Sequence, residues 1–294
     1  MVRKIELSKE RMDRVKNEEI ERRMELIGTD TLYHYTSIDS LYHIIKNKEI
    51  WFTNTSVMND KSESINFVSL LEKELLNACS KKADDIASFF NSIEQRISTE
   101  AAYAFCLSCL KDDASQWERY ADYGKGACIC IDVKKLLSVF YRYDVICNKV
   151  FYDSDIKDNM LYFSLLSYFE GTGTYPYPDI SVLSNFIVFA SFVNKHNSFK
   201  TESEFRVGTT ISDIEKIKGM TRDFVLSKGE IKNILRLNLK KIFDNDINQI
   251  DLLFSGVIIG PKSNQSKRIL SEYFSENGFI NLSKAITISD CPLR

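Results

Sequence analysis

Apolar positions along the chain form short strand-like runs that alternate with stretches of helical periodicity. The strand pattern occurs at residues 32–34, 50–53, 101–110, 144–152, 222–227, 233–238, 252–260 and 285–290, and in the segments ACICIDV and SEFRVGTTI. The helical pattern occurs at residues 8–27, 264–277, twice within 64–98 and over most of 155–195. Strands that follow one another without regular βαβ alternation predict an α+β protein.

The segment LYHYTSIDSLYHIIKNKEIWFTN, which begins at Leu32, contains a strand, a helix and a second strand. Ser37 and Asp39 are both suitable caps for the helix. His34 lies where the first strand leads into the helix, a position from which a side chain reaches a cleft. Ligand binding and a purely structural role are both open for this histidine.

Composition excludes few classes of protein. Of 294 residues, 44% are hydrophobic and 27% charged, as in ordinary globular proteins, and the formal charge of -2 gives no global argument for nucleic-acid or membrane binding. No apolar run approaches the roughly 20 residues that cross a bilayer. The N-terminus lacks the apolar core of a signal peptide, and seven cysteines fit reduced thiols, so we expect a cytoplasmic protein.

The segment KTESEFRV carries the most suggestive chemistry. Glu202 and Glu204 are spaced i, i+2 where a strand begins, so on a strand they share one face. Paired carboxylates can stabilise a positively charged transition state or activate a hydroxyl group or water. The alternative is a surface ion-pair ladder with Arg206, and Arg206 is also suited to orienting Glu204.

The segment SQWERYADYGKG predicts a short helix and a turn. Trp117 and Tyr120 share a helix face and are expected in the core, whereas Ser115 and Gln116 are the better surface candidates. The Gly-Lys-Gly element lacks the spacing of a phosphate-binding loop and is interpreted as a turn. The loop GTGTYPYPD (171–179) is either a lid or acceptor-recognition loop, or a simple surface excursion.

The cysteine spacing suggests zinc only superficially. Cys106 and Cys109 lie in an apparent buried strand, where their odd spacing directs them to opposite faces. We therefore expect no metal site.

The motifs together resemble a known bacterial family. The segments YHYTSIDSLYHIIKNKEIWFTN, SQWERYADYGKGACI, FKTESEFRV, SGVIIGPK and ITISDCPLR occur in the order typical of domain-of-unknown-function family 2971. The resemblance runs from about Leu32 to the C-terminus, and its specificity comes from the combination of motifs.

The same arrangement is similar, more distantly, to the ADP-ribosyltransferase fold. This resemblance implies mixed, mostly antiparallel sheets forming a split core with flanking helices, and NAD as the substrate. It implies that Glu204 stabilises the oxocarbenium-like charge as nicotinamide leaves, that Glu202 orients or deprotonates the acceptor, and that His34 holds the adenosine-side ribose. NAD would lie in a cleft with His34 on one wall and Glu204 on the other.

The resemblance also implies a set of NAD-contacting residues. Thr36 or Ser37 would support the nicotinamide pocket, and Tyr35, in place of the usual small residue, would narrow it. Tyr120 and Ser108 are candidates for the middle motif of the fold. The full binding set comprises His34, Tyr35, Thr36, Ser37, Asn54, Tyr120 and Arg206.

We therefore expect a charged N-terminal helix (1–30) and a single α+β domain (31–294) with a helical insertion at about 155–195. The expected function is that of an NAD-dependent ADP-ribosyltransferase or NAD glycohydrolase, of the toxin or anti-phage defence type. Its acceptor would be a protein, nucleic acid or nucleotide. The alternative is a catalytically inactive module that binds a nucleotide or a protein on the same fold.

Overall fold

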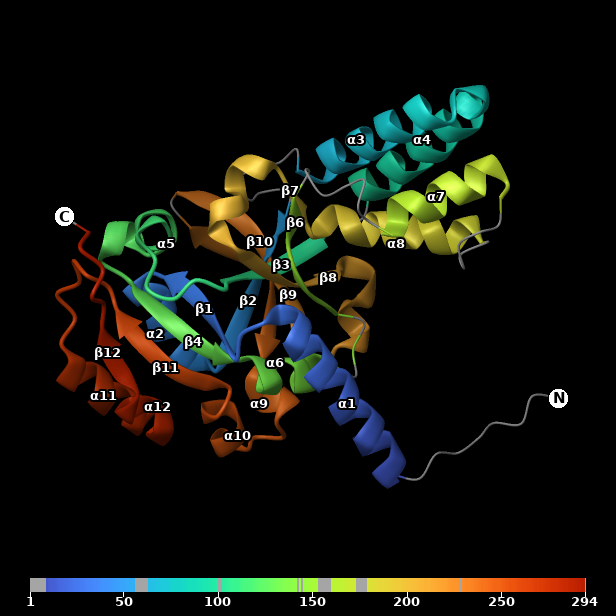
Figure 1. Ribbon diagram of the computed structural model, residues 1–294. Coiled ribbons are helices and arrows are strands. Elements are labelled where there is room, and N and C mark those ends of the chain that lie inside the picture. The colour runs from blue at the N-terminus through green and yellow to red at the C-terminus, as the bar shows by residue number, and fades with distance from the viewer. Residues whose placement is uncertain are drawn as a thin grey trace. The chain divides into compact units, whose positions relative to one another are not determined.

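The structure is a computed structural model that describes residues 9–55, 63–99, 102–141, 143, 145–152, 160–172, 179–227 and 229–293. It confirms a mixed α+β protein with mostly antiparallel strands (Figure 1). The helices are α1 (Lys9–Ile27), α2 (Ile38–Asn47), α3 (Glu63–Ala78), α4 (Ala83–Thr99), α5 (Ala114–Tyr120), α6 (Val133–Phe140), α7 (Met160–Glu170), α8 (Ile180–Phe192), α9 (Leu239–Ile242), α10 (Ile247–Asp251), α11 (Lys267–Glu276) and α12 (Ile280–Lys284). The strands are β1 (Thr31–Thr36), β2 (Glu49–Asn54), β3 (Ala102–Ser108), β4 (Ala127–Asp132), β5 (Ile146–Lys149), β6 (Phe151–Tyr152), β7 (Asn194–Lys195), β8 (Glu204–Thr210), β9 (Met220–Ser227), β10 (Glu230–Asn238), β11 (Phe254–Ile259) and β12 (Ile286–Ile288).

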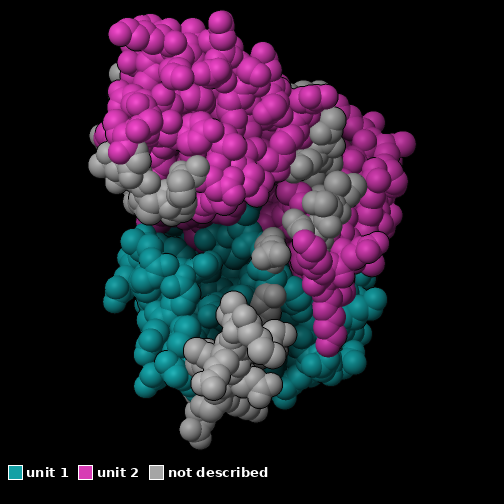
Figure 2. All heavy atoms as spheres, turned by 90° about the vertical axis from the view of Figure 1, so that its right-hand side faces the viewer, with its two compact units in different colours: residues 1–49, 107–147, 238–294 teal, residues 50–106, 148–237 magenta. Residues whose placement is uncertain are grey.

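The chain forms two compact units, which Figure 2 shows in different colours. Unit 1 contains residues 1–49, 107–147 and 238–294, and unit 2 contains residues 50–106 and 148–237. The chain therefore passes between the units several times. The expected division into an N-terminal helix (1–30) and a single domain (31–294) stays a prediction, because a compact unit need not be a domain that folds independently.

Unit 1 is built on an antiparallel core of three strands with a parallel edge strand. β4 pairs antiparallel with β1 on one side and with β11 on the other, and β12 adds to β11 in parallel. The β1–β4 register places His34 opposite Ile129 and Thr36 opposite Ala127. The charged helix α1 packs on α6 of the same unit and buries Ile20.

The β1–α2–β2 segment forms as its sequence predicts. The side chain of Ser37 caps α2 by accepting a hydrogen bond from the Ser40 N–H at 3.1 Å. The apolar face of α2 buries Leu41, Ile44 and Ile45. α2 ends where Lys48 adopts a left-handed conformation (φ 56°), which lets β2 begin directly afterwards.

Unit 2 combines a sheet with four packed helices. β2 and β3 are antiparallel neighbours, as are β9 and β10, and β8 pairs with β3. Helices α3, α4, α7 and α8 pack against one another (Figure 1). A separate parallel pair, β6–β7, places Tyr152 opposite Lys195.

Several details differ from the sequence-based expectations. Residues 144–152 contain two short strands, β5 and β6, in place of one. β3 ends at Ser108, so Cys109 lies beyond the strand and not within it. Helix α6 was not predicted, although its buried residues Val133, Leu136, Leu137 and Phe140 have the i, i+3, i+4, i+7 spacing of an amphipathic helix.

Within the described part of the chain, no helix combines the length and the apolar character needed to cross a membrane. All seven cysteines are free thiols.

Candidate functional site

The predicted site residues divide between the two units. His34, Tyr35, Thr36, Ser37 and Tyr120 belong to unit 1, and Asn54, Glu202, Glu204 and Arg206 belong to unit 2. An NAD cleft lined by residues of both groups stays a prediction.

In unit 2 the two predicted acids converge on one cation. Nζ of Lys195, on β7, donates to Oε2 of Glu202 at 2.6 Å and to Oε2 of Glu204 at 3.0 Å. Arg206 holds Glu204 from the other side, with Nε 2.8 Å from Oε1 and a second guanidinium nitrogen 3.2 Å from Oε2. These four side chains, two acids and two bases, form what we call the buried ion cluster.

The cluster corrects two expectations. The acids do not share a strand face, because Glu202 ends a 3-10 helix (Asn197–Glu202) and only Glu204 lies on β8. Ser203 between them takes a left-handed conformation (φ 45°), which turns the chain. The cluster is also not a surface ladder, since Glu202 is 3% and Glu204 7% exposed.

The electrostatics of Glu204 follow from its partners. Burial alone would raise the pKa of its carboxyl group, but the charges of Arg206 and Lys195 outweigh burial and lower that pKa to about 2. Glu204 is therefore ionised at neutral pH. A buried carboxylate is tolerated here because both its oxygens receive charged hydrogen-bond donors.

Three groups around Glu204 were missed by the sequence analysis. Besides Lys195, the hydroxyl oxygen of Tyr152 accepts a hydrogen bond from the Glu204 N–H at 3.4 Å, and the Cys106 thiol interacts with the Glu204 side chain. Burial, followed by the nearby Glu204 charge, raises the pKa of that thiol. No local signal marks these residues, because β3, β6 and β7 bring them together from distant parts of the chain.

In unit 1, several of the motifs meet in one packed framework around Trp117. The rings of Tyr35 and Trp117 meet edge to face, with centroids 5.0 Å apart. The Trp117 Nε1–H donates to Oδ1 of Asp112 at 2.7 Å, and Asp112 also accepts hydrogen bonds from the Ser289 hydroxyl and the Asp290 N–H. The C-terminal motif is thereby attached to the helix that carries Trp117.

The carboxyl group of Asp112 is tuned by these contacts. Burial would raise its pKa, but the hydrogen bonds from Ser289 and Trp117 lower it below the usual value. Asp112 itself has a positive φ of 52°, a conformation that Asp tolerates better than most residues. The loop between β3 and α5 is thus held by side-chain hydrogen bonds.

The Gly-Lys-Gly element is a turn, as predicted. Gly124 has a φ of +86°, and Gly126 precedes β4 with its N–H bonded to the Ala121 carbonyl at 2.8 Å. Gly260 donates to the Gly126 carbonyl at 2.9 Å, so the segment SGVIIGPK packs on this turn.

Helix α5 departs from its predicted exposure. Trp117 is fully buried, as expected, but Tyr120 is 36% exposed and so is not a core residue. Gln116, expected at the surface, is 4% exposed. The reason is that α5 has only seven residues and turns its adjacent Gln116 and Trp117 inward, while Tyr120 is its last residue.

The remaining predicted binding residues have mixed exposure. His34 is half-buried near the end of β1, Thr36 is buried, and Ser37 uses its hydroxyl oxygen as the α2 cap. In unit 2, Asn54 is buried at the end of β2, opposite Tyr103. Ser108, the other candidate for the middle motif, is buried, and its Oγ accepts from the Leu110 N–H at 3.1 Å. Their roles toward NAD stay predictions.

Residues 171–179, the predicted lid or recognition loop, lie mostly outside the described residues. Of that loop the structure describes Gly171, Thr172 and Asp179, which caps α8 by accepting from the Ser181 N–H. Among the described side chains, no group of three or more His, Cys, Asp or Glu is arranged to hold a metal ion.

The hydroxyl group of Tyr35 provides a test of the unit 1 framework. It donates to the Leu110 carbonyl at 2.8 Å and accepts from the Asp113 N–H at 3.0 Å. We expect Tyr35→Phe to lower the free energy of unfolding by about 1–3 kcal/mol, because two backbone groups lose a partner. Urea denaturation measures this, with Tyr123→Phe, at a 69% exposed site, as a control expected to change little. Equal effects of both variants would contradict the framework role.

The fold and these clusters define an α+β protein with a buried ion cluster in one unit and a motif-built framework in the other. Comparison with protein families identifies a match over residues 116–207 to the family described as "Protein of unknown function (DUF2971)". The match confirms the family resemblance over that stretch, which starts at Gln116 and ends just after Arg206. Comparisons with curated proteins and with solved structures find no match.

Proposed function

We propose that the chain is an ADP-ribosyltransferase-like enzyme that cleaves the nicotinamide glycosidic bond of NAD. It would transfer ADP-ribose to a macromolecule or nucleotide, or to water, as an effector of the toxin or anti-phage defence type. The observation that carries the proposal is the buried ion cluster, in which Glu204 is held ionised at the start of β8 and Glu202 is brought to the same cation.

In the proposed reaction the bond between C1′ of the ribose and the nicotinamide nitrogen breaks, and its electron pair leaves with nicotinamide. A Glu204 that is ionised at neutral pH would stabilise the positive charge that develops on the ribose. Glu202 would take the proton of the acceptor hydroxyl group or water that attacks C1′. His34 would hold the adenosine-side ribose, and Arg206 would fix the orientation of Glu204 through its paired hydrogen bonds.

This chemistry requires the cluster to open. Lys195 and Arg206 occupy both carboxylate oxygens of Glu204, and the residue is 7% exposed. Lys195 must therefore release Glu204 and Glu202 before a ribose hydroxyl group can bind them.

The same observation favours the second function, a catalytically inactive module that binds a nucleotide or a protein. If the cluster never opens, its four charges only hold β7, β8 and the 3-10 helix together. Binding would then depend on other surfaces, and Glu204 would have a purely structural role.

The two functions are separated by nicotinamide release from NAD, measured with purified protein and cell lysate as the acceptor source. The enzyme proposal expects release by the wild type and a loss of about a hundredfold or more in Glu204→Gln, as for the removal of a group that stabilises transition-state charge. Calorimetry measures NAD binding on the same samples. Both are recorded at a temperature where circular dichroism shows each variant folded.

A destabilised control separates catalysis from folding. Gly229→Ala forces a residue with a side chain into a φ of +81° on the β9–β10 turn, away from the cluster in sequence. This variant should keep full activity. Neither turnover nor NAD binding in the wild type would favour the binding module, and turnover that survives Glu204→Gln would remove Glu204 from the mechanism.

A further inference from the structure

Lys48, the residue that follows α2 in unit 1, carries a buried ammonium group. The residue is 8% exposed. Among the described residues its Nζ has one hydrogen-bond acceptor, Oδ1 of Asn277, at 3.5 Å, which is long for such a bond. Nζ also lies 5.5 Å from the centroid of the Phe279 ring. Because an ammonium group has three donors, Lys48 can donate to further acceptors.

The other buried cations show what such a group usually contacts. Three cations are buried in the described part of the chain: Lys48, Lys195 and Arg206. The carboxylates of the buried ion cluster hold Lys195 and Arg206. Lys48 forms no ion pair with a carboxylate of the described residues. Since lysine is rarely buried without a counter-charge, the surroundings of Lys48 favour an anion from outside the chain.

The charged neighbours of Lys48 are also positive. Lys46 lies two residues earlier, on α2, and Lys240 lies at the start of α9, where the Leu239 N–H donates to the Lys48 carbonyl at 2.8 Å. Burial, followed by the charges of Lys240 and Lys46, lowers the pKa of Lys48. Lys46 and Lys240 are both exposed, so an anion from solvent can reach them.

We propose that Lys48, Lys46 and Lys240 bind a phosphate group. A phosphate group carries a charge of about -1.5 to -2 at neutral pH and has several strong acceptor oxygens, so it can contact more than one ammonium group at once. Lysine binds phosphate as a point charge, without the planar geometry that arginine requires. A carboxylate carries a single charge and would balance less of the positive charge of the three lysines.

This site lies at the opposite end of α2 from the residues proposed to hold NAD in unit 1. Ser37 caps the start of α2 and Lys48 follows its end, and a helix of ten residues is about 15 Å long. The phosphate proposal therefore does not depend on the proposed function.

An aromatic pair lies one helical turn before the site on two helices. Tyr42 precedes Lys46 by four residues on α2, and Tyr273 of α11 precedes Asn277 by four. The two rings stack, with centroids 5.3 Å and planes 15° apart, and Tyr42 is 44% exposed. Because a nucleobase can stack on such a ring, the phosphate group could come from a nucleotide or from inorganic phosphate.

Isothermal titration calorimetry of the full chain with inorganic phosphate, at constant ionic strength, tests the proposal. The wild type should bind phosphate with a dissociation constant in the millimolar range, and Lys48→Met should weaken binding at least about tenfold. Lys46→Gln and Lys240→Gln should each weaken it by a smaller factor, because solvent and salt screen exposed charges.

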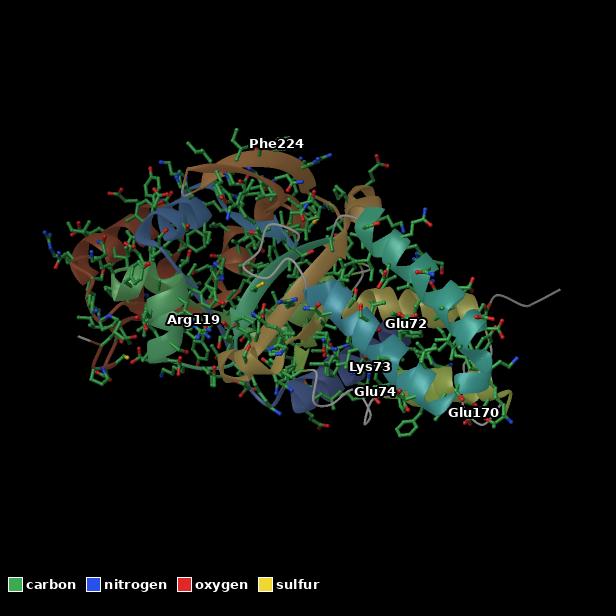
Figure 3. All side chains as sticks on the ribbon, turned by 90° about the horizontal axis from the view of Figure 1, so that it is seen from above. Glu72, Lys73, Glu74, Arg119, Glu170 and Phe224 are labelled. Carbon is green, nitrogen blue, oxygen red and sulfur yellow. The ribbon has the colours of Figure 1, made fainter. Side chains whose placement is uncertain are left out.

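Two exposed lysines provide matched controls. Lys73 of α3 lies between Glu72 and Glu74 in sequence (Figure 3), and Lys125 belongs to the Gly-Lys-Gly turn. Lys73→Met and Lys125→Met should leave phosphate binding unchanged. Circular dichroism confirms that each variant is folded. If Lys48→Met does not fold, the double variant Lys46→Gln/Lys240→Gln, at exposed positions, replaces it in the test.

Three results would overturn the proposal: no phosphate binding by the wild type up to about 20 mM, unchanged binding in Lys48→Met or its replacement, or an equal loss in the controls. Acetate that binds as tightly as phosphate would also reject a phosphate site. Adenosine monophosphate that binds more tightly than phosphate, and less so in Tyr42→Ala, would support the site with a nucleotide as the source. Equal affinities for both would support it with phosphate alone.

Discussion

Glu204→Gln is expected to lower the free energy of unfolding by about 3–5 kcal/mol, the range for removal of one partner from a buried ion pair. The cluster holds two acids and two bases, and the substitution removes the carboxylate that contacts both Lys195 and Arg206. The positive charge that Glu204 balances lies in a site where Lys195 and Arg206 are 7% and 4% exposed. Urea denaturation followed by circular dichroism measures the loss.

Two further variants make the result specific. Glu272→Gln removes one partner of an exposed pair with Arg268, and it should cost no more than about 1 kcal/mol. Adding Lys195→Met to Glu204→Gln restores charge balance between Arg206 and Glu202, so it should recover part of the lost stability. Equal losses for Glu204→Gln and Glu272→Gln would show that the cluster is not a buried, coupled unit.

The pH dependence of the free energy of unfolding tests the contribution of Glu204 independently. The pKa of Glu204 falls from 4.5 to about 2 on folding, so its stabilising contribution is present above pH 4.5 and is lost as the pH falls toward 2. A shift of this size corresponds to about 3 kcal/mol. The difference in stability between the wild type and Glu204→Gln should therefore shrink between pH 4.5 and 2, and a constant difference would contradict the ionised state.

This stability effect bears directly on function. Because Glu204 is expected to stabilise unit 2, a loss of activity in Glu204→Gln has meaning only where the variant is shown to be folded. The ion cluster thus links the two functional proposals: an enzyme must open it, and a binding module need not.

Local patterns predicted most of the elements, because helix and strand periodicity depends on neighbours in sequence. Ser37 caps α2 as expected, and the strand preceding it carries His34 where the sequence placed it. The expected pairing of Glu202 with Glu204 failed in its geometry because Ser203 adopts a left-handed conformation, which sequence rarely signals for serine. Lys195 was missed because its contacts are set by the fold and not by its neighbours.

The two units were also not predicted, and the structure shows why no linker marks them. The chain passes from one unit to the other within β2, β3 and β5 and at the end of β10. Residues in strands carry the apolar pattern of a core, without the Gly, Pro and polar composition of a linker. A boundary of this kind leaves no compositional trace.

Gly126→Ala is expected to be the most damaging substitution in unit 1. A Cβ at this position would overlap the Thr36 carbonyl oxygen and lie 2.8 Å from that of Ala121. Both obstacles are backbone atoms, which cannot rotate away, and Thr36 and Ala127 are paired in the β1–β4 register. We expect a loss of at least about 3 kcal/mol in the free energy of unfolding, toward the upper end for overpacking.

Gly229→Ala is the matched control, since it adds the same methyl group where nothing lies within 4 Å. Its cost should be only the roughly 1–2 kcal/mol of a left-handed backbone with a side chain. Urea denaturation of both variants separates close approach from backbone conformation. If Gly126→Ala costs no more than Gly229→Ala, the end of β1 moves freely against the turn before β4. If it costs far more, the end of the strand that carries His34 is held in close backbone contact with the Gly-Lys-Gly turn.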